Sequence, residues 1–255
     1  KEAREYGLPN PKGVLILGIP GTGKSLTAKV ASSILGRPIL RLDAGRLFAG
    51  IVGESEANLR RAVRTAEAIA PCILWIDEIE KGMSGARSSG ASDGGTSARV
   101  FGSFLSWMQE KTSPVFVIAT ANDIGQLPPE LLRKGRFDEL FFVDLPDDNE
   151  RAAIWRIHIN RRGREADTFD IHAFVQLSEG FTGSEIQQAV TDAMFDCFDE
   201  GKELDTGSIV RAIDGTVPLS ITMAEQIKSL RQWAGNRARR ASPRSSSDGS
   251  RRIAA

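Results

Sequence analysis

The fold is decided by the stretch VLILGIPGTGKS, residues 14–25, in which a short apolar run precedes a glycine-rich turn. Residues 14–17 predict a buried strand, and the segment after Ser25 predicts a helix. Glycines between a strand and a helix let successive backbone amides point into one concavity that holds phosphate oxygens. Lys24 would add a positive charge on the β- and γ-phosphates, and Ser25 would offer its hydroxyl to Mg²⁺. The residues expected to bind nucleotide here are Gly18, Pro20, Gly21, Thr22, Gly23, Lys24 and Ser25.

Apolar runs with little polar alternation recur up to residue 145. They lie at residues 14–17, 38–42, 72–76, 115–120 and 140–143. Such runs are typical of strands that are buried on both faces of a parallel sheet. The segments between them, among them 56–69 and 98–109, are long enough for crossover helices. The sequence therefore predicts an α/β fold with a three-layer core.

Strand signals disappear after residue 149, and only helical patterns remain. The clearest is an apolar stripe that runs from Ile186 to Cys197 with helical spacing. The preceding TGSE, residues 182–185, has the form of a capping box. We expect three parts: an α/β core at 1–146, a small helical bundle with a C-terminal helix at 147–234, and a basic disordered tail at 235–255.

The composition is that of an ordinary globular protein. The 255 residues include 33 Lys and Arg against 33 Asp and Glu, so the chain does not depend on overall positive charge to hold nucleic acid. Two cysteines fit a reducing compartment. No apolar run approaches the ~18 residues of a membrane span, and we expect none. Because Lys1 is not an initiator methionine, we also expect a natural segment before it.

Two acidic residues, Asp77 and Glu78, follow the apolar run CILWI at 72–76. Ligands of open α/β sheets bind at the carboxyl ends of strands, where this pair would lie. Asp77 would hold Mg²⁺ through its water shell, and Glu78 would orient and polarise an attacking water. Taken alone, the pair could be two solvated acids that open a loop. Beside the glycine-rich turn we interpret them as a metal-binding and a catalytic residue.

A third polar strand end is formed by Asn122, which follows the apolar run at 115–120. It could hold a water or the γ-phosphate, or it could be an ordinary turn residue. Further on, Arg133 and Arg136 lie in the stretch LLRKGRFD, residues 131–138, which has neither helical nor strand period. They could be a pair of guanidinium groups for a phosphate, or a solvated basic loop.

Together these residues resemble the nucleotide-binding module of AAA+ ATPases, specifically the AAA clade in the strict sense. Lys24 and Ser25 match Walker A, Asp77 and Glu78 match Walker B, and Asn122 matches sensor 1. The arginine fingers, which in that family reach the ATP of the neighbouring subunit, match Arg133 and Arg136. The resemblance implies ATP and Mg²⁺ as ligands, a parallel sheet of order 5-1-4-3-2, a helical lid and a homo-oligomeric ring, usually a hexamer.

The family resemblance continues into the helical part. The segment FTGSEI, residues 181–186, is similar to the start of the lid helix near the nucleotide, which implies cofactor contacts for Gly183 and Ser184. The clade has no sensor-2 arginine there. The segments at 46–56 and 104–112 resemble AAA proteins of photosynthetic bacteria and plastids, whose members carry an additional N-terminal region. This implies the cytoplasm or the plastid stroma as location.

One departure from the family concerns its first pore loop. Members that thread polypeptides place an aromatic residue there, whereas this chain has Ile51, Val52 and Gly53. Aliphatic side chains can still press on a translocating protein client, but they lack the flat face of an aromatic. The small, polar stretch at 82–97 excludes a packed element, and it could be a second pore loop or a flexible surface loop.

The activity predicted is Mg²⁺-dependent ATP hydrolysis by a ring, coupled to remodelling of a protein partner. The alternative is an ATP-gated assembly scaffold with slow turnover, which Ile51 favours and Glu78 disfavours. A third reading, a motor that acts on nucleic acid, has support only from the basic tail. The histidines, His158 and His172, have no partner at i+4, so we expect no zinc-protease motif.

Overall fold

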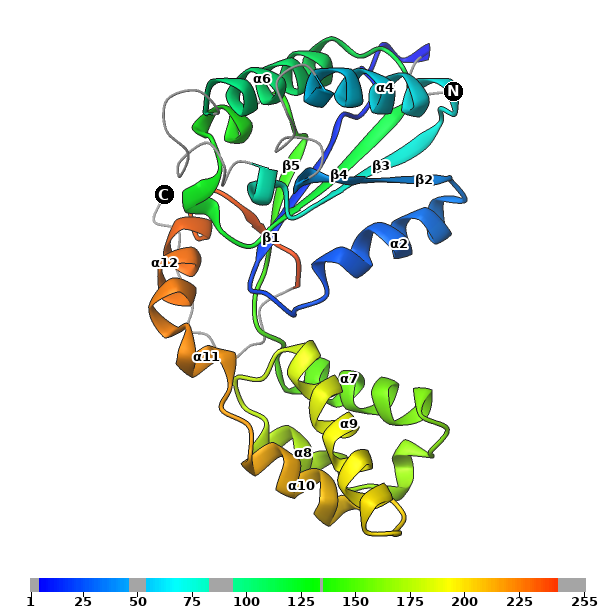
Figure 1. Cartoon of the computed structure of the whole chain (residues 1–255), viewed down its shortest axis with the longest axis vertical. Coiled ribbons are helices and arrows are strands. Elements are labelled where there is room, and N and C mark those ends of the chain that lie inside the picture. Colours follow the sequence, from blue (N-terminus) through cyan, green and yellow to red (C-terminus); the bar gives the residue numbers. More distant parts are fainter. Residues whose placement is uncertain (1–4, 46–53, 83–93, 134, 243–255) are drawn as a thin grey trace. The chain divides into compact units, whose positions relative to one another are not determined.

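The computed structural model describes residues 5–45, 54–82, 94–133 and 135–242 (Figure 1). Its internal contacts divide the chain into two compact units. The first unit comprises Lys1–Gly18, Lys24–Phe142 and Trp233–Arg239, and the second comprises Ile19–Gly23, Val143–Gln232 and Arg240–Ala255.

The first unit is built around a sheet. Its strands are β1 (Gly13–Gly18), β2 (Ile39–Asp43), β3 (Cys72–Asp77), β4 (Val115–Ala121), β5 (Glu139–Val143) and β6 (Arg239–Arg240). They lie in the order β2-β3-β4-β1-β5-β6. The predicted order 5-1-4-3-2 is therefore confirmed for five strands, and β6 adds a sixth strand beside β5. The pairs β1–β4, β2–β3 and β3–β4 are parallel, as the apolar runs predicted.

Helices cover both faces of this sheet and give the predicted three layers. They are α2 (Lys24–Leu35), α4 (Glu54–Ala68) and α6 (Gly94–Glu110). Figure 1 shows α4 and α6 on one face and α2 on the other. One short 3₁₀-helix, Ile79–Gly82, follows β3, and two more, Ile124–Gln126 and Pro129–Leu132, lie between β4 and β5. The fold class is thus α/β, as predicted.

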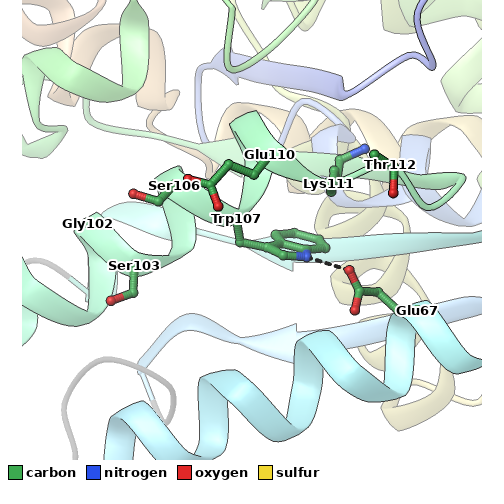
Figure 2. Close-up of a pocket in the computed structure, with 8 residues that line it drawn as sticks. All are labelled: Glu67, Gly102, Ser103, Ser106, Trp107, Glu110, Lys111 and Thr112. Atoms are coloured by element: carbon green, nitrogen blue, oxygen red, sulfur yellow. Dashed lines mark hydrogen bonds between the residues drawn. The ribbon is translucent and has the colours of Figure 1, made fainter.

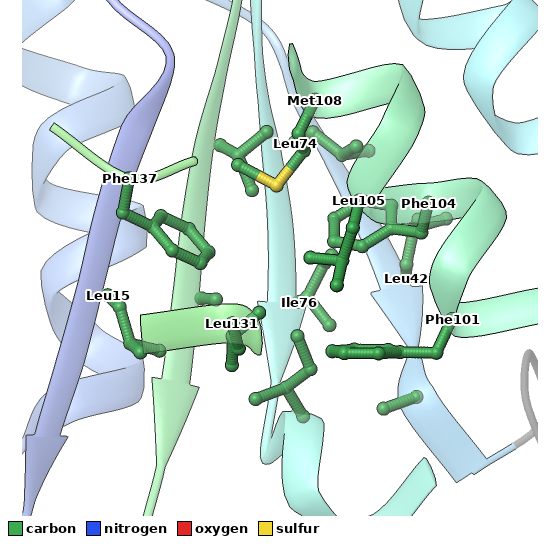
Figure 3. Close-up of a cluster of buried hydrophobic side chains, with 14 of the residues drawn as sticks. Leu15, Leu42, Leu74, Ile76, Phe101, Phe104, Leu105, Met108, Leu131 and Phe137 are labelled. Carbon is green, nitrogen blue, oxygen red and sulfur yellow. The ribbon is translucent and has the colours of Figure 1, made fainter. Parts of the chain in front are cut away.

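Helix α6 joins the outer layer to the core. On one side, Trp107 Nε1 donates to Glu67 Oε1 of α4 at 2.9 Å (Figure 2). On the other side, Phe101, Phe104, Leu105 and Met108 point into the apolar cluster over β3 (Figure 3). The helix begins at Gly94, so the expectation of no packed element across 82–97 is wrong for its last residues. Threonine and serine are common in a first helical turn, which composition alone does not reveal.

The second unit consists of helices between residues 148 and 232. Its helices are α7 (Asp148–Arg161), α8 (Ile171–Leu177), α9 (Gly183–Asp199), α10 (Thr206–Asp214), α11 (Leu219–Thr222) and α12 (Ala224–Ala234), and a further 3₁₀-helix lies at Ala166–Thr168. The predicted capping box is confirmed, because Thr182 and Glu185 satisfy each other's backbone amides. The apolar stripe of α9 is buried in a core that includes Trp155 and Phe174.

The end of the chain differs from the expectation of a tail without packed elements from residue 235. Arg239–Arg240 form β6, and the guanidinium of Arg237 lies 5.5 Å from the centre of the Trp233 ring. The cation–π contact and the pairing of β6 with β5 order residues 237–240, although the high charge of this stretch predicted disorder. Residues 243–255 lie outside the described part of the chain. None of the helices in that part is both long enough and apolar enough to traverse a bilayer.

Candidate functional site

The carboxyl ends of β3 and β4 meet at one edge of the sheet in the first unit. Ile76 pairs with Ala119 in the parallel register, so Asp77 comes next to Thr120. Asp77 Oδ1 accepts two hydroxyl hydrogen bonds, from Ser25 Oγ at 2.7 Å and from Thr120 Oγ1 at 2.6 Å. The predicted metal-binding residues Ser25 and Asp77 are therefore in direct contact.

Glu78 has a backbone conformation that sets it apart. Its φ of +50° is the one positive value among the non-glycine residues of the described ranges. The Glu78 amide donates to Thr120 Oγ1 at 2.9 Å, and its Oε1 accepts from Asn122 Nδ2 at 3.0 Å. Lys81, one turn of 3₁₀-helix later, pairs with Oε2, and this contact raises the pKa of the lysine. The two predicted residues Glu78 and Asn122 are thus hydrogen-bonded partners.

Lys24 is buried, with 6 % of its surface exposed. Burial lowers the pKa of its ammonium group from 10.5 to about 8, although the charges of Glu80, Glu78 and Asp77 act in the opposite direction. Burial disfavours the charged form of an ammonium group, because the protein interior solvates it less well than water does. A position of this kind fits an anionic ligand, because phosphate would compensate the buried charge.

Glu80 belongs to the same cluster, although no pattern in the sequence indicates it. Its Oε1 accepts from the Asn122 amide at 2.9 Å, and its buried Oε2 has no hydrogen-bond partner in the described chain. Burial raises the pKa of this carboxyl group. The 3₁₀-helix Ile79–Gly82 turns Glu80 toward β4, and neither helical nor strand periodicity could have indicated that.

Arg41 is a second neighbour of the site that no sequence motif indicates. Its guanidinium lies 4.7 Å from the centre of the Trp75 ring, and its Nη2 lies 3.5 Å from Asp77 Oδ2. The register of β2 and β3 pairs Arg41 with Trp75. Only strand pairing brings this residue to the site, since 36 residues separate Arg41 from Asp77 along the chain.

The first half of the glycine-rich turn, Ile19–Gly23, belongs to the second unit. There Gly21 O accepts from the Ser184 amide at 3.1 Å, and Thr22 Oγ1 donates to Ile19 O at 2.7 Å. Gly21 has φ +79°, and a Cβ there would come within 2.9 Å of Thr182 Oγ1 and 3.1 Å of Ser184 Cβ. The structure thus brings the predicted residue Ser184, with Gly183 beside it, to the turn. Gly23 has φ +88°, Pro20 is half-buried, and Gly18 is the buried last residue of β1.

The two predicted arginines differ in their surroundings. Arg133 is exposed and lines a pocket of about 690 Å³ with Phe137 and Trp233. Arg136 is half-buried, and its buried Nη1 has no hydrogen-bond partner within the described ranges. Within those ranges, neither arginine forms a hydrogen bond or an ion pair with Asp77, Glu78 or Asn122.

The expected pore-loop residues lie outside the described part of the chain. This holds for Ile51 and Val52 and for most of the 82–97 stretch.

A second pocket of about 690 Å³ is lined by Glu67, Trp107 and small residues of α6 (Figure 2). It contains none of the predicted site residues.

A comparison with protein families identifies this arrangement. The model of the ATPase family associated with various cellular activities (AAA) matches residues 14–145. The chain belongs to the AAA family. The sequence-based resemblance to this family is thereby confirmed, and members of the AAA family are ATPases.

Curated relatives fall within the same family. The chain is 53% identical over 244 residues to the uncharacterized AAA domain-containing protein ycf46 of Pyropia yezoensis, covering 95% of this chain and 49% of that one. The ycf46 protein of Guillardia theta is 50% identical, with coverage of 92% and 46%. The proteasome-activating nucleotidase of Aeropyrum pernix is 33% identical, with coverage of 83% and 52%. The chain spans about half the length of these relatives.

The described residues of the AAA module fit ATP and Mg²⁺. Among them, no cluster of three or more His, Cys, Asp or Glu side chains could hold a metal ion. Mg²⁺ does not require such a cluster, because it is usually held by one or two protein oxygens together with waters and substrate phosphates. Ser25 and Asp77, which are in contact through a hydroxyl and a carboxylate, carry the oxygens that such a partial site would use. Lys24 provides the buried positive charge beside it.

Proposed function

We propose that this chain binds Mg²⁺–ATP at the end of β1, β3 and β4 and hydrolyses it to ADP and phosphate. The observation that carries the proposal is the pair of contacts Ser25–Asp77 and Asn122–Glu78 at one sheet edge. The first contact joins a hydroxyl and a carboxylate suited to a hydrated Mg²⁺. The second contact orients the Glu78 carboxylate at the same edge of the sheet. A site that only bound nucleotide would need the first contact but not the second.

Each residue has a distinct part in the proposed reaction. When bound, Mg²⁺–ATP supplies the phosphoanhydride bond and a cation that offsets phosphate charge. Lys24 binds the β- and γ-phosphates with its ammonium group. Glu78, oriented by Asn122, positions a water and accepts its proton as the water oxygen bonds to the γ-phosphorus. The bond from that phosphorus to the bridging oxygen then breaks, and ADP leaves.

Glu78→Gln tests the proposal directly. Glutamine keeps the shape of the side chain and an oxygen that can accept the hydrogen bond from Asn122 Nδ2, but it cannot accept a proton from water. We therefore expect turnover to fall by about 10²- to 10⁴-fold while the ATP affinity is kept. The exposed Glu110 on α6 offers a matched control, because Glu110→Gln makes the same chemical change elsewhere in the first unit. Release of phosphate and the ATP dissociation constant are measured for both. Undiminished turnover in Glu78→Gln contradicts the role of Glu78.

We further propose that Arg133 and Arg136 act on the nucleotide of a neighbouring copy in a homo-oligomeric ring of AAA type, such as a hexamer. The exposure of Arg133 and the unpartnered Nη1 of Arg136 support this proposal. Glu78→Gln and a double Arg133→Ala, Arg136→Ala variant are each expected to be inactive alone. Mixing them creates some sites with an intact glutamate and intact neighbouring arginines, so activity should return. A mixture without activity contradicts the proposal.

The partner and the location are proposals as well. Similarity to the proteasome-activating nucleotidase supports a protein client that the ring remodels. If residues Ile51 and Val52 grip such a client, Ile51→Ala abolishes stimulation of the ATPase by an unfolded polypeptide such as reduced casein. The same stimulation in wild type and variant favours the ATP-gated scaffold. Of the two locations expected, the cytoplasm and the plastid stroma, the resemblance to ycf46 proteins encoded in plastid genomes supports the plastid stroma.

A further inference from the structure

Thr120 forms hydrogen bonds with both acidic residues of the site, Asp77 and Glu78. It lies on β4 and is 1 % exposed. Its single hydroxyl donates to Asp77 Oδ1 at 2.6 Å and accepts from the Glu78 amide at 2.9 Å. One oxygen atom thus connects a strand end to both acidic residues of the adjacent strand.

The two partners require a group that both donates and accepts. A carboxylate oxygen needs a donor, and a backbone amide needs an acceptor, so a hydroxyl satisfies both where a methyl group satisfies neither. Glu78 adopts φ +50°, a left-handed conformation that is unfavourable for a residue with a side chain. The hydrogen bond from its amide to Thr120 compensates part of this cost. The left-handed turn ends β3 and brings the Glu78 side chain into contact with Asn122.

The hydroxyl also has a role that Ser25 cannot take over. Ser25 and Thr120 donate to the same oxygen, Asp77 Oδ1. If the Ser25 oxygen turns to a metal ion, as proposed above, its hydrogen bond to Asp77 is weakened. Thr120 is buried and remains with Asp77, so the carboxylate keeps its orientation during the change.

We propose that Thr120 is a positioning residue for ATP hydrolysis: through one hydroxyl it fixes the carboxylate of Asp77 and the strained backbone of Glu78. This inference rests on the proposed function. Thr120 touches neither water nor phosphate in this role and acts only through the two acids. Loss of the hydroxyl should therefore affect turnover far more than nucleotide binding.

Thr120→Val and Thr120→Ser form the test. Valine has the shape of threonine without its hydroxyl, whereas serine keeps the hydroxyl. For Thr120→Val we expect kcat to fall by about 10- to 100-fold, the loss typical of a misplaced catalytic group, with KM and the ATP dissociation constant within about twofold. Thr120→Ser should recover kcat to within about threefold of wild type. Thr65→Val, on the exposed side of α4, controls for loss of a hydroxyl elsewhere.

A second readout does not depend on activity. Because the Glu78 amide donates to Thr120, its hydrogen exchange in the nucleotide-free protein should be faster in Thr120→Val and unchanged in Thr120→Ser. If Thr120→Val does not fold, the smaller Thr120→Ala takes its place in both measurements.

The outcomes separate this inference from the function on which it rests. A wild-type protein that binds but does not hydrolyse ATP contradicts the proposed function. An active wild type with an equally active Thr120→Val contradicts the positioning role alone. Equal losses of kcat and of ATP affinity, without recovery in Thr120→Ser, would show a merely structural residue and also overturn the proposal.

Discussion

Removing the charge of Lys24 should stabilise the nucleotide-free protein. The lysine is buried at the start of α2, and burial holds its pKa at about 8 instead of 10.5. A tenfold change in proton affinity is worth about 1.4 kcal/mol, so the charged form is disfavoured by about 3 kcal/mol in the folded state. Lys24→Met replaces the ammonium group by an apolar side chain of similar length. We expect the variant to be up to about 3 kcal/mol more stable than wild type at pH 7.

The pH dependence gives this prediction its sharpest form. The folded protein binds the Lys24 proton less tightly than the unfolded chain does, so the stability of the wild type rises between pH 8 and 10.5. The advantage of Lys24→Met should therefore shrink with rising pH, to about 1 kcal/mol near pH 9.5. Urea-induced unfolding followed by tryptophan fluorescence measures both values. Lys29→Met, an exposed change on the same helix, should alter stability by less than about 1 kcal/mol.

Two results would refute the reasoning about Lys24. A variant no more stable than wild type at pH 7 would mean that the ammonium group is not strained by burial. A stability gap that stays constant up to pH 9.5 would mean that protonation of Lys24 is not its source. Nucleotide should reverse the order, because phosphate compensates the charge of the wild type and stabilises only the protein that binds it.

Three further predictions concern single contacts. Trp155→Ala removes a fully buried ring 5.0 Å from that of Phe174 and should cost about 3–5 kcal/mol, seen as a lower thermal unfolding midpoint of the second unit; an unchanged midpoint would contradict the packing. Asp147→Ala removes the cap of α7 and should cost about 1 kcal/mol in urea unfolding, whereas Asp147→Asn should be nearly neutral. Asn122→Ala loses the hydrogen bond to Glu78, so kcat should fall about 10- to 100-fold at constant ATP affinity, and a matching rise in KM would argue against it.

The sequence anticipated the elements of the site better than their surroundings. Asp77, Glu78 and Asn122 are predictable because each follows an apolar run, and the strand ends of a parallel sheet meet at one edge. Glu80 and Arg41 do not directly follow an apolar run, so the same reasoning does not predict them. Glu80 depends on a single turn of 3₁₀-helix, and Arg41 depends on the pairing of β2 with β3. The strand β6 was missed because two arginines in a basic stretch lack the apolar pattern of a strand.

The sequence by itself determined the order of strands and helices, the glycine-rich turn and the capping box of α9. These features arise from interactions between residues a few positions apart, which apolar period, glycine and capping residues record directly. Only the tertiary structure decided that Thr120 would meet Asp77 and Glu78, more than 40 residues earlier in the chain, and that Lys24 would be buried beside three acids. Strand register and burial are properties of the assembled sheet. A short segment of sequence cannot express them, because the partner atoms come from elsewhere in the chain.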